Sequence, residues 1–125
     1  MRRVILIVLF AGLACGLLSR QAGARAPYLK EFKEKYGAGD EAYANLIEET
    51  KCFICHVGKS KKNRNSYGIA LSKVVMKNEK QKAKIAEALG KVEEEKSPDG
   101  KTFGELIKEH KLPGGPPQKE DPQKE

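Results

Sequence analysis

The sequence predicts a small all-α domain, and three observations support this fold class. Apolar residues recur at helical spacing, most regularly over residues 85–92. β-Branched residues alternating at a period of two, which would indicate strands, are absent. Two helix-start signals are explicit, since Asp40 precedes one apolar stretch and Thr102 precedes another. The chain has 125 residues, a length that allows one domain.

Two helices are expected in the first part of this domain. The first covers residues 27–36, because Pro27 suits a first helical position and Gly37 suits a helix end. The second begins after Asp40, its N-cap, and leads into Lys51-Cys52. The side of each helix that we expect to be buried comprises Tyr28, Leu29, Phe32 and Tyr36 in the first and Tyr43, Leu46, Ile47 and Thr50 in the second.

Residues 58–65 break this pattern and form a polar, strongly basic loop. Ser66 is expected to cap a third helix over residues 67–77. Ile69 and Met76 lie on one face of this helix. A different face carries its main apolar stripe, which comprises Tyr67, Leu71, Val74 and Val75.

Two more helices are expected before a polar tail. One passes through residues 85–92, and a turn follows at residues 97–100. Thr102 and Glu105 predict a capping box at the start of the last helix. The apolar face of that helix comprises Phe103, Leu106, Ile107 and His110. Residues 113–125 are rich in Pro, Gln, Lys and Glu and are expected to be disordered.

Residues 1–24 are predicted to be a secretory signal peptide. A positively charged start precedes an uncharged apolar run, and small residues follow that run. Cleavage is expected after Ala24, with Ala26 as the alternative, which leaves a domain over residues 25–112 in the periplasm or another extracytoplasmic compartment. The apolar run is shorter than the about 20 residues that a spanning helix needs. An uncleaved anchor or lipidation of Cys15 would instead hold the domain at a membrane.

Removal of the signal would lower the net charge of +7. Arg2, Arg3 and Arg20 would leave, so 21 of the 24 basic residues and all 17 acidic residues would remain, a net charge of +4. This is mildly basic and is not the charge of a dedicated nucleic-acid binder. The chain also has no Trp and few other aromatic residues for base stacking. We therefore expect no nucleic-acid partner.

The residues that indicate chemistry form the string Cys52-Phe53-Ile54-Cys55-His56. Two intervening residues place the thiols about one helical turn apart, and His56 projects from the same side as Cys52. This arrangement suits covalent haem attachment, in which each thiol forms a thioether with a vinyl group and the imidazole binds the iron. Export agrees with this interpretation, because haem is attached to such proteins outside the cytoplasm.

Three other interpretations of the cysteine pair remain open. A redox-active disulfide is typical of a βαβ context, which is missing here. A zinc site usually has four ligands, and the only other histidine, His110, is distant in the sequence. The third is a plain structural disulfide. Each of these would make the chain a secreted thiol- or metal-binding domain without haem.

On this motif, the signal peptide and the run of helices, the chain resembles the monohaem c-type cytochromes, broadly the class I group. The resemblance implies a small domain of about four to five short helices around one covalent haem c. It implies that Cys52 and Cys55 carry the thioether links and that His56 is the fifth iron ligand. The implied activity is one-electron transfer between membrane or periplasmic redox proteins, and not enzymatic catalysis.

Two departures from the class I pattern concern the iron ligands. Class I proteins commonly have Gly-Pro shortly after the haem histidine, and the proline carbonyl accepts the second imidazole N–H. Here Gly58 is followed by Lys59, so another acceptor must orient His56. The usual distal methionine also lies in an extended loop, whereas Met76 is expected in a helix.

Met76 is the first candidate for the distal iron ligand, and its thioether would raise the reduction potential. Filling the core is its alternative role. His110 is the second candidate, and its alternative role is a favourable interaction with a helix C-terminus. If neither residue binds iron, the sixth site is open or holds another ligand. With an open site the protein would be a haem sensor or a minor peroxidase.

Basic side chains follow the motif closely and are expected to ring an exposed haem edge. These are Lys59, Lys61, Lys62 and Arg64. Such a charge cluster accelerates docking onto an acidic redox partner and makes the rate salt-dependent. A solvated loop without a partner is the alternative. Further candidates, for hydrogen bonds to the haem propionates, are Asn63, Asn65, Tyr67 and Gly68.

Overall fold

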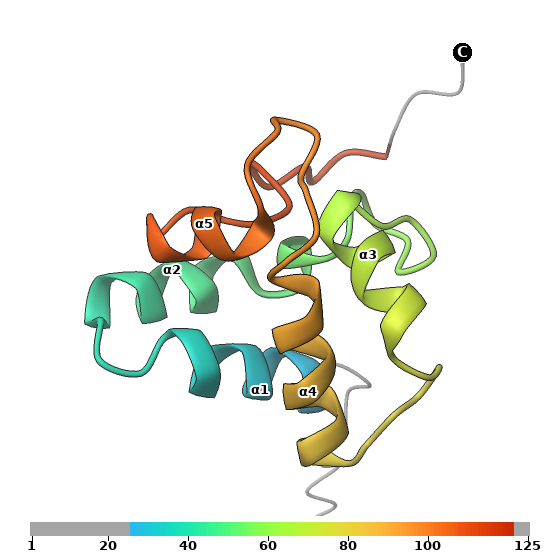
Figure 1. Ribbon diagram of the computed structural model, residues 1–125. Helices are drawn as coiled ribbons and strands as arrows, with labels where there is room; N and C mark the ends of the chain where they lie inside the picture. Colours follow the sequence, from blue (N-terminus) through green and yellow to red (C-terminus); the bar gives the residue numbers. More distant parts are fainter. Residues whose placement is uncertain (1–25, 122–125) are drawn as a thin grey trace, which may run out of the picture.

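The computed structural model describes residues 26–121, which contain helices and no strand (Figure 1). In chain order the helices are α1 Ala26–Tyr36, α2 Glu41–Thr50, the 3-10 helix η1 Lys51–Ile54, α3 Ser66–Val74, α4 Lys82–Val92 and α5 Phe103–Lys108. The all-α prediction is confirmed. None of the helices in the described part has the length and apolar character that a membrane crossing requires. The predicted signal peptide, Cys15 included, lies outside the described residues.

Local capping signals define the first two helices. Pro27 lies in the first turn of α1, and the N–H of Gly37 closes the helix by donating to the Lys33 carbonyl at 2.8 Å. Asp40 caps α2 as predicted, because its side chain accepts the Tyr43 N–H at 2.7 Å. Short-range hydrogen bonds therefore suffice to place both of these helix ends.

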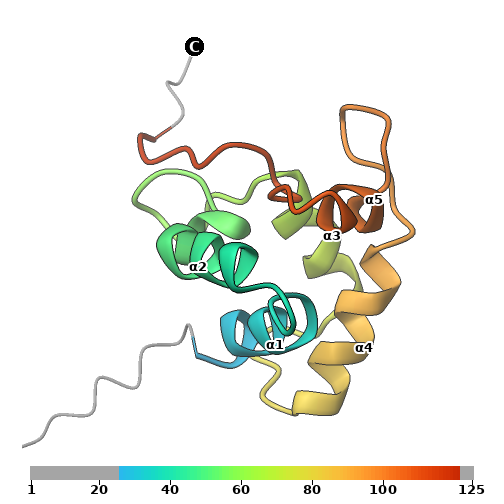
Figure 2. The same ribbon diagram turned by 90° about the vertical axis from the view of Figure 1, so that its left-hand side faces the viewer.

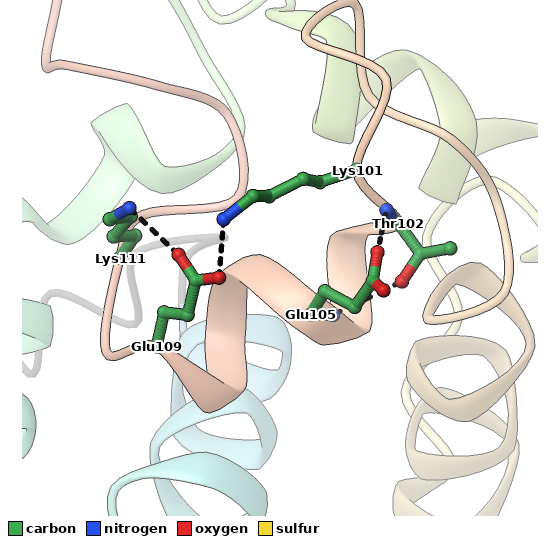
Figure 3. Close-up of polar contacts among 5 residues, drawn as sticks. All are labelled: Lys101, Thr102, Glu105, Glu109 and Lys111. Carbon is green, nitrogen blue, oxygen red and sulfur yellow. Dashed lines mark hydrogen bonds and ion pairs between the residues drawn. The ribbon is translucent and has the colours of Figure 1, made fainter.

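The capping box of α5 is also confirmed (Figure 3). Thr102 Oγ1 accepts the Glu105 N–H at 3.1 Å, and the Glu105 carboxylate accepts the Thr102 N–H at 2.7 Å. Just beyond the helix, Glu109 lies between Lys101 and Lys111. Hydrogen bonds from these two lysines lower the pKa of Glu109 to about 2. The carboxylate of Glu109 therefore stays ionised well into the acid range.

The third helix differs from the prediction at both ends. Its cap is Asn65 and not Ser66, because the Asn65 side chain accepts a backbone N–H of the first turn. The helix ends at Val74 and not at residue 77, since Val75 has an extended backbone conformation. Met76 consequently lies in the loop that follows α3, and the prediction of a helical Met76 was wrong.

One apolar core joins the helices. α1 packs against α2 and α4, and α4 packs in turn against α3 (Figures 1 and 2). The Tyr67 ring links three helices, with its centroid 5.9 Å from that of Phe32 and 5.2 Å from that of Phe103. Its buried hydroxyl has no hydrogen-bond partner among residues 26–121. The α4 stripe predicted from spacing is buried, namely Ile85, Ala88, Leu89 and Val92.

The last residues of the chain do not form a disordered tail up to residue 121. Pro113 is fully buried. The Gln118 carbonyl accepts the Gly58 N–H at 2.8 Å, and the Asp121 carboxylate accepts the Lys59 N–H at 2.9 Å. Composition alone pointed to disorder, but these hydrogen bonds satisfy loop donors and hold residues 113–121 against the start of the basic loop. Residues 122–125 lie outside the described part.

Candidate functional site

A cavity of about 880 Å³ opens between α1, η1, α3 and the loops that follow η1 and α3. This volume falls within the about 300–1,000 Å³ of small-molecule and cofactor sites. Cys52, Cys55 and His56 line it, and so does Met76. The tertiary structure therefore brings the sequence motif and the first distal-ligand candidate to one space. The apolar part of the wall includes Leu29, Phe32, Ile54, Leu71, Val75 and Leu89.

A tight turn presents both thiols of the motif to the cavity. Cys52 lies in η1, and its carbonyl accepts the N–H groups of Cys55 at 3.3 Å and His56 at 2.9 Å. Because one acceptor serves both donors, the backbone of residues 52–56 is closely constrained. The expected separation of about one turn is therefore realised in a 3-10 helix. No disulfide bond joins Cys52 and Cys55.

The junction that leads into this turn is strained. Lys51 has φ 50° and ψ −117°, a conformation that residues with a side chain rarely adopt. Its N–H still donates to the Ile47 carbonyl and closes α2. Such a backbone costs on the order of 1–3 kcal/mol and persists only where the surroundings hold it. Buried Thr50 and Ile54 on either side supply that restraint.

The imidazole of His56 is oriented by a backbone carbonyl. His56 Nδ1 lies 3.1 Å from the Asn63 oxygen, which can only accept, so Nδ1 carries the proton. The same oxygen accepts the Val57 N–H at 3.2 Å, and an antiparallel bridge joins His56 to Arg64. Because Lys59 and not proline follows Gly58, another group had to accept the imidazole N–H of His56, and the Asn63 carbonyl is that acceptor. Nε2 is left as the nitrogen able to bind a metal.

Burial alters the chemistry of one thiol. Cys55 packs against the core. Desolvation raises its pKa to about 12, with Cys52 adding to the rise and Arg64 opposing it. Since the thiolate is the form that exchanges with disulfides, burial disfavours that reaction at Cys55. Within residues 26–121, no three His, Cys, Asp or Glu side chains gather in a group suited to a metal ion.

The two distal-ligand candidates lie in different places. Met76 is 72% exposed at the cavity, and its carbonyl accepts the Tyr28 hydroxyl at 3.3 Å, which anchors the loop to α1. His110 lies beyond α5, with Nδ1 3.3 Å from Asp40 Oδ2 and its ring stacked on Tyr43 at 5.3 Å. It is not among the residues that line the cavity. The geometry therefore favours Met76 over His110.

Positive charge surrounds the cavity mouth. Of the predicted quartet, Lys61, Lys62 and Arg64 line the cavity, whereas Lys59 does not. All four side chains are exposed, and none forms an ion pair within the described part of the chain. Sequence reasoning missed two further basic residues of the wall, Lys51 and Lys77. Lys51 directly precedes the motif and Lys77 follows α3, so neither belongs to the basic loop.

Two residues predicted as hydrogen-bond candidates for the propionates, Asn65 and Gly68, contact the backbone of the motif. The Asn65 side chain donates to the Ile54 carbonyl at 2.9 Å. Gly68 brings α3 against the motif so closely that a Cβ atom there would lie 2.0 Å from the Cys55 oxygen. A glycine in the first turn of a capped helix is the sequence signal that indicates such an approach.

No family model matches the chain, and comparison with curated proteins and with solved structures found no match. Its functional assignment therefore depends on the chemistry and geometry of its own residues.

Proposed function

We propose that the chain is a small exported c-type cytochrome, of class I type, that carries single electrons through one covalently bound haem. The observation that carries this proposal is the shared cavity. Two thiols one turn apart, an imidazole with Nε2 free and a thioether all line one largely apolar space. No other feature of the described chain assembles a comparable set of groups.

The residues of the cavity fit haem c. Cys52 and Cys55 would hold it through thioethers, and His56 would bind its iron through Nε2. The apolar wall suits the porphyrin face, while Lys61 and Arg64 at the mouth suit the acidic propionates. Bound haem would supply one-electron chemistry, with the iron alternating between its ferrous and ferric states.

The chain's own groups would tune that chemistry. The Asn63 carbonyl holds the His56 ring in one orientation and makes it a stronger base, as outer hydrogen bonds to metal ligands generally do. The apolar wall would limit the access of water to a bound haem. Met76, held near the cavity through the Tyr28 hydroxyl, is the proposed distal ligand, and a thioether there raises the reduction potential.

Mass spectrometry of the full chain, produced with its signal in a host that attaches haem, tests the proposal. The mature protein is expected to begin at Arg25, to exceed its peptide mass by one haem and to resist alkylation at both cysteines. Its reduced form is expected to have the visible bands of a low-spin c-type haem. A colourless product with two alkylatable thiols would rule the proposal out and leave a secreted thiol-binding domain.

The basic residues around the cavity mouth are proposed to dock an acidic redox partner. Changing all four residues of the quartet to glutamine should slow oxidation of the reduced protein by hexacyanoferrate(III), an anion, by about tenfold at low salt. The slowing should shrink as ionic strength rises, because salt screens exposed charge. Stopped-flow absorbance gives both rates. The quartet comprises Lys59, Lys61, Lys62 and Arg64.

A matched quartet tests whether position matters beyond net charge. Its members are exposed and lie outside the cavity wall, namely Lys30, Lys80, Lys96 and Lys108. Their change to glutamine should leave most of the rate with the anion intact. A cationic cobalt(III) oxidant should react no more slowly with the first variant than with the unmodified protein. Equal anion rates for both variants would contradict docking at the cavity mouth.

A further inference from the structure

We propose that Asn65 is a positioning residue for the cysteine pair, because its side chain holds the backbone between Cys52 and Cys55 and thereby sets the spacing of the thiols. This inference rests on the proposed function, since the spacing matters when both thiols bond to one rigid group. It assigns a role to a residue that lies outside the motif and ten residues beyond Cys55 in the sequence.

Asn65 supplies hydrogen-bond donors to three consecutive carbonyls of the motif. Its side-chain Nδ2 lies 2.9 Å from the Ile54 oxygen and 3.3 Å from the Phe53 oxygen. Its backbone N–H donates to the Cys55 oxygen at 3.1 Å. Phe53 and Ile54 are the two residues between the cysteines, at the end of η1, where carbonyls lack partners within the helix. One residue therefore satisfies the acceptors that separate the two thiols.

The same side chain also starts α3. Asn65 Oδ1 accepts the Gly68 N–H at 2.9 Å, so the amide joins the helix to the motif. Asparagine can fill both roles, because its amide oxygen accepts the N–H of the helix while its NH₂ group donates to the motif. The other common cap residues, Asp, Ser and Thr, have no NH₂ group.

Gly114, at the start of the C-terminal segment, also packs against the Asn65 amide. An added Cβ at Gly114 would lie 2.0 Å from Asn65 Nδ2, so the backbone of residue 114 packs directly on the amide. The amide is therefore enclosed by α3, by the motif and by the tail. This enclosure restricts the side chain to the orientation that reaches both carbonyls.

Replacing Asn65 with serine separates the two roles of the side chain. Serine is an equally good N-cap, so α3 should persist, but the donors to Phe53 and Ile54 are lost. Hydrogen exchange of the Cys55 and His56 amides, measured by NMR on the full chain as isolated, should accelerate by about tenfold. This factor corresponds to the loss of one hydrogen bond whose net contribution to stability is near the top of the usual range. The exchange of Leu89 in α4 should not change.

Asn45→Ser is the matched control, since Asn45 is exposed in α2 and does not line the cavity. It should leave exchange in the motif unchanged. Gly114→Ala is a second variant that displaces the amide without removing it, and it should accelerate the same two amides. It keeps the inference testable if Asn65→Ser fails to fold, which circular dichroism would detect.

Peptide mass mapping adds a readout on the thiols. In a host that attaches haem, Asn65→Ser should give a larger share of chains bonded through one cysteine only than Asn45→Ser does. Unchanged amide exchange or equal acceleration in α4 would overturn the positioning role. In chains that carry haem, an unchanged share of doubly bonded chains would overturn it as well. The exchange measurement needs no haem, so a chain that carries none would refute the proposed function while still deciding whether Asn65 holds the motif.

Discussion

Gly68→Ala is expected to destabilise the protein by about 3 kcal/mol or more, at the upper end of the cost of overpacking. The added methyl group would lie 2.0 Å from the carbonyl oxygen of Cys55 and 2.9 Å from its carbonyl carbon. Both are backbone atoms of the constrained turn, so neither can yield as a flexible side chain would. Either α3 or the motif must shift. Equilibrium unfolding in urea measures the change in free energy.

Gly90→Ala is the matched control for this prediction. Gly90 lies inside α4, and the only nearby atom is the end of the Lys35 side chain, 3.8 Å from an added Cβ. Alanine should therefore stabilise the protein by about 0.5–1 kcal/mol through its better helix propensity. The two substitutions are chemically identical and should have opposite signs. A Gly68→Ala protein as stable as the original would mean that α3 does not pack against Cys55.

Met76→Leu should convert the proposed carrier into a protein with an open iron site. Leucine keeps the apolar volume but cannot bind iron. The reduced variant should take up carbon monoxide readily, whereas the original protein should do so slowly. Its reduction potential should fall by about 0.1–0.2 V, a fraction of the roughly 0.8 V over which axial ligands set haem potentials. Carbon monoxide difference spectra and a redox titration provide these measurements.

Val74→Leu serves as the control for Met76→Leu. Val74 is exposed, is the last residue of α3 and does not line the cavity. Its replacement should therefore change neither the uptake of carbon monoxide nor the reduction potential. Because the Met76 side chain is largely exposed, Met76→Leu should change stability by less than about 0.5 kcal/mol before iron is considered. If the original protein binds carbon monoxide as fast as the variant, Met76 is no ligand. The open-site alternative, a haem sensor or minor peroxidase, would then be favoured.

Helix prediction succeeded where the determining interactions are local. The Asp40 cap, the Thr102–Glu105 capping box and the stripe over residues 85–92 all depend on residues within about two turns of one another, and all three are present. It failed at the end of α3, where neither glycine nor proline marks a stop. There the Tyr28 hydroxyl, contributed by α1, binds the Met76 carbonyl, and Asn78 turns the chain with φ 62°.

Part of the proposed site could also be predicted from the sequence, and part of it could not. The spacing of Cys52, Cys55 and His56 could be recognised because the group they are proposed to hold requires that local pattern. The acceptor for His56 could not be identified, since it is a main-chain oxygen and any residue type could supply it. The choice of Met76 over His110 also required the tertiary structure, because both are single residues without a surrounding motif.

The sequence by itself determined the helical class, most helix starts and the thiol–imidazole motif, because these follow from periodicity, capping and spacing over a few residues. Only the tertiary structure decided that the motif shares a cavity with Met76, that Asn65 and Gly68 join α3 to the turn, and that residues 113–121 pack on the basic loop. Such contacts connect segments far apart in the chain. They depend on how closely the backbones of these segments approach one another, and the local pattern of side chains in the sequence does not specify that distance.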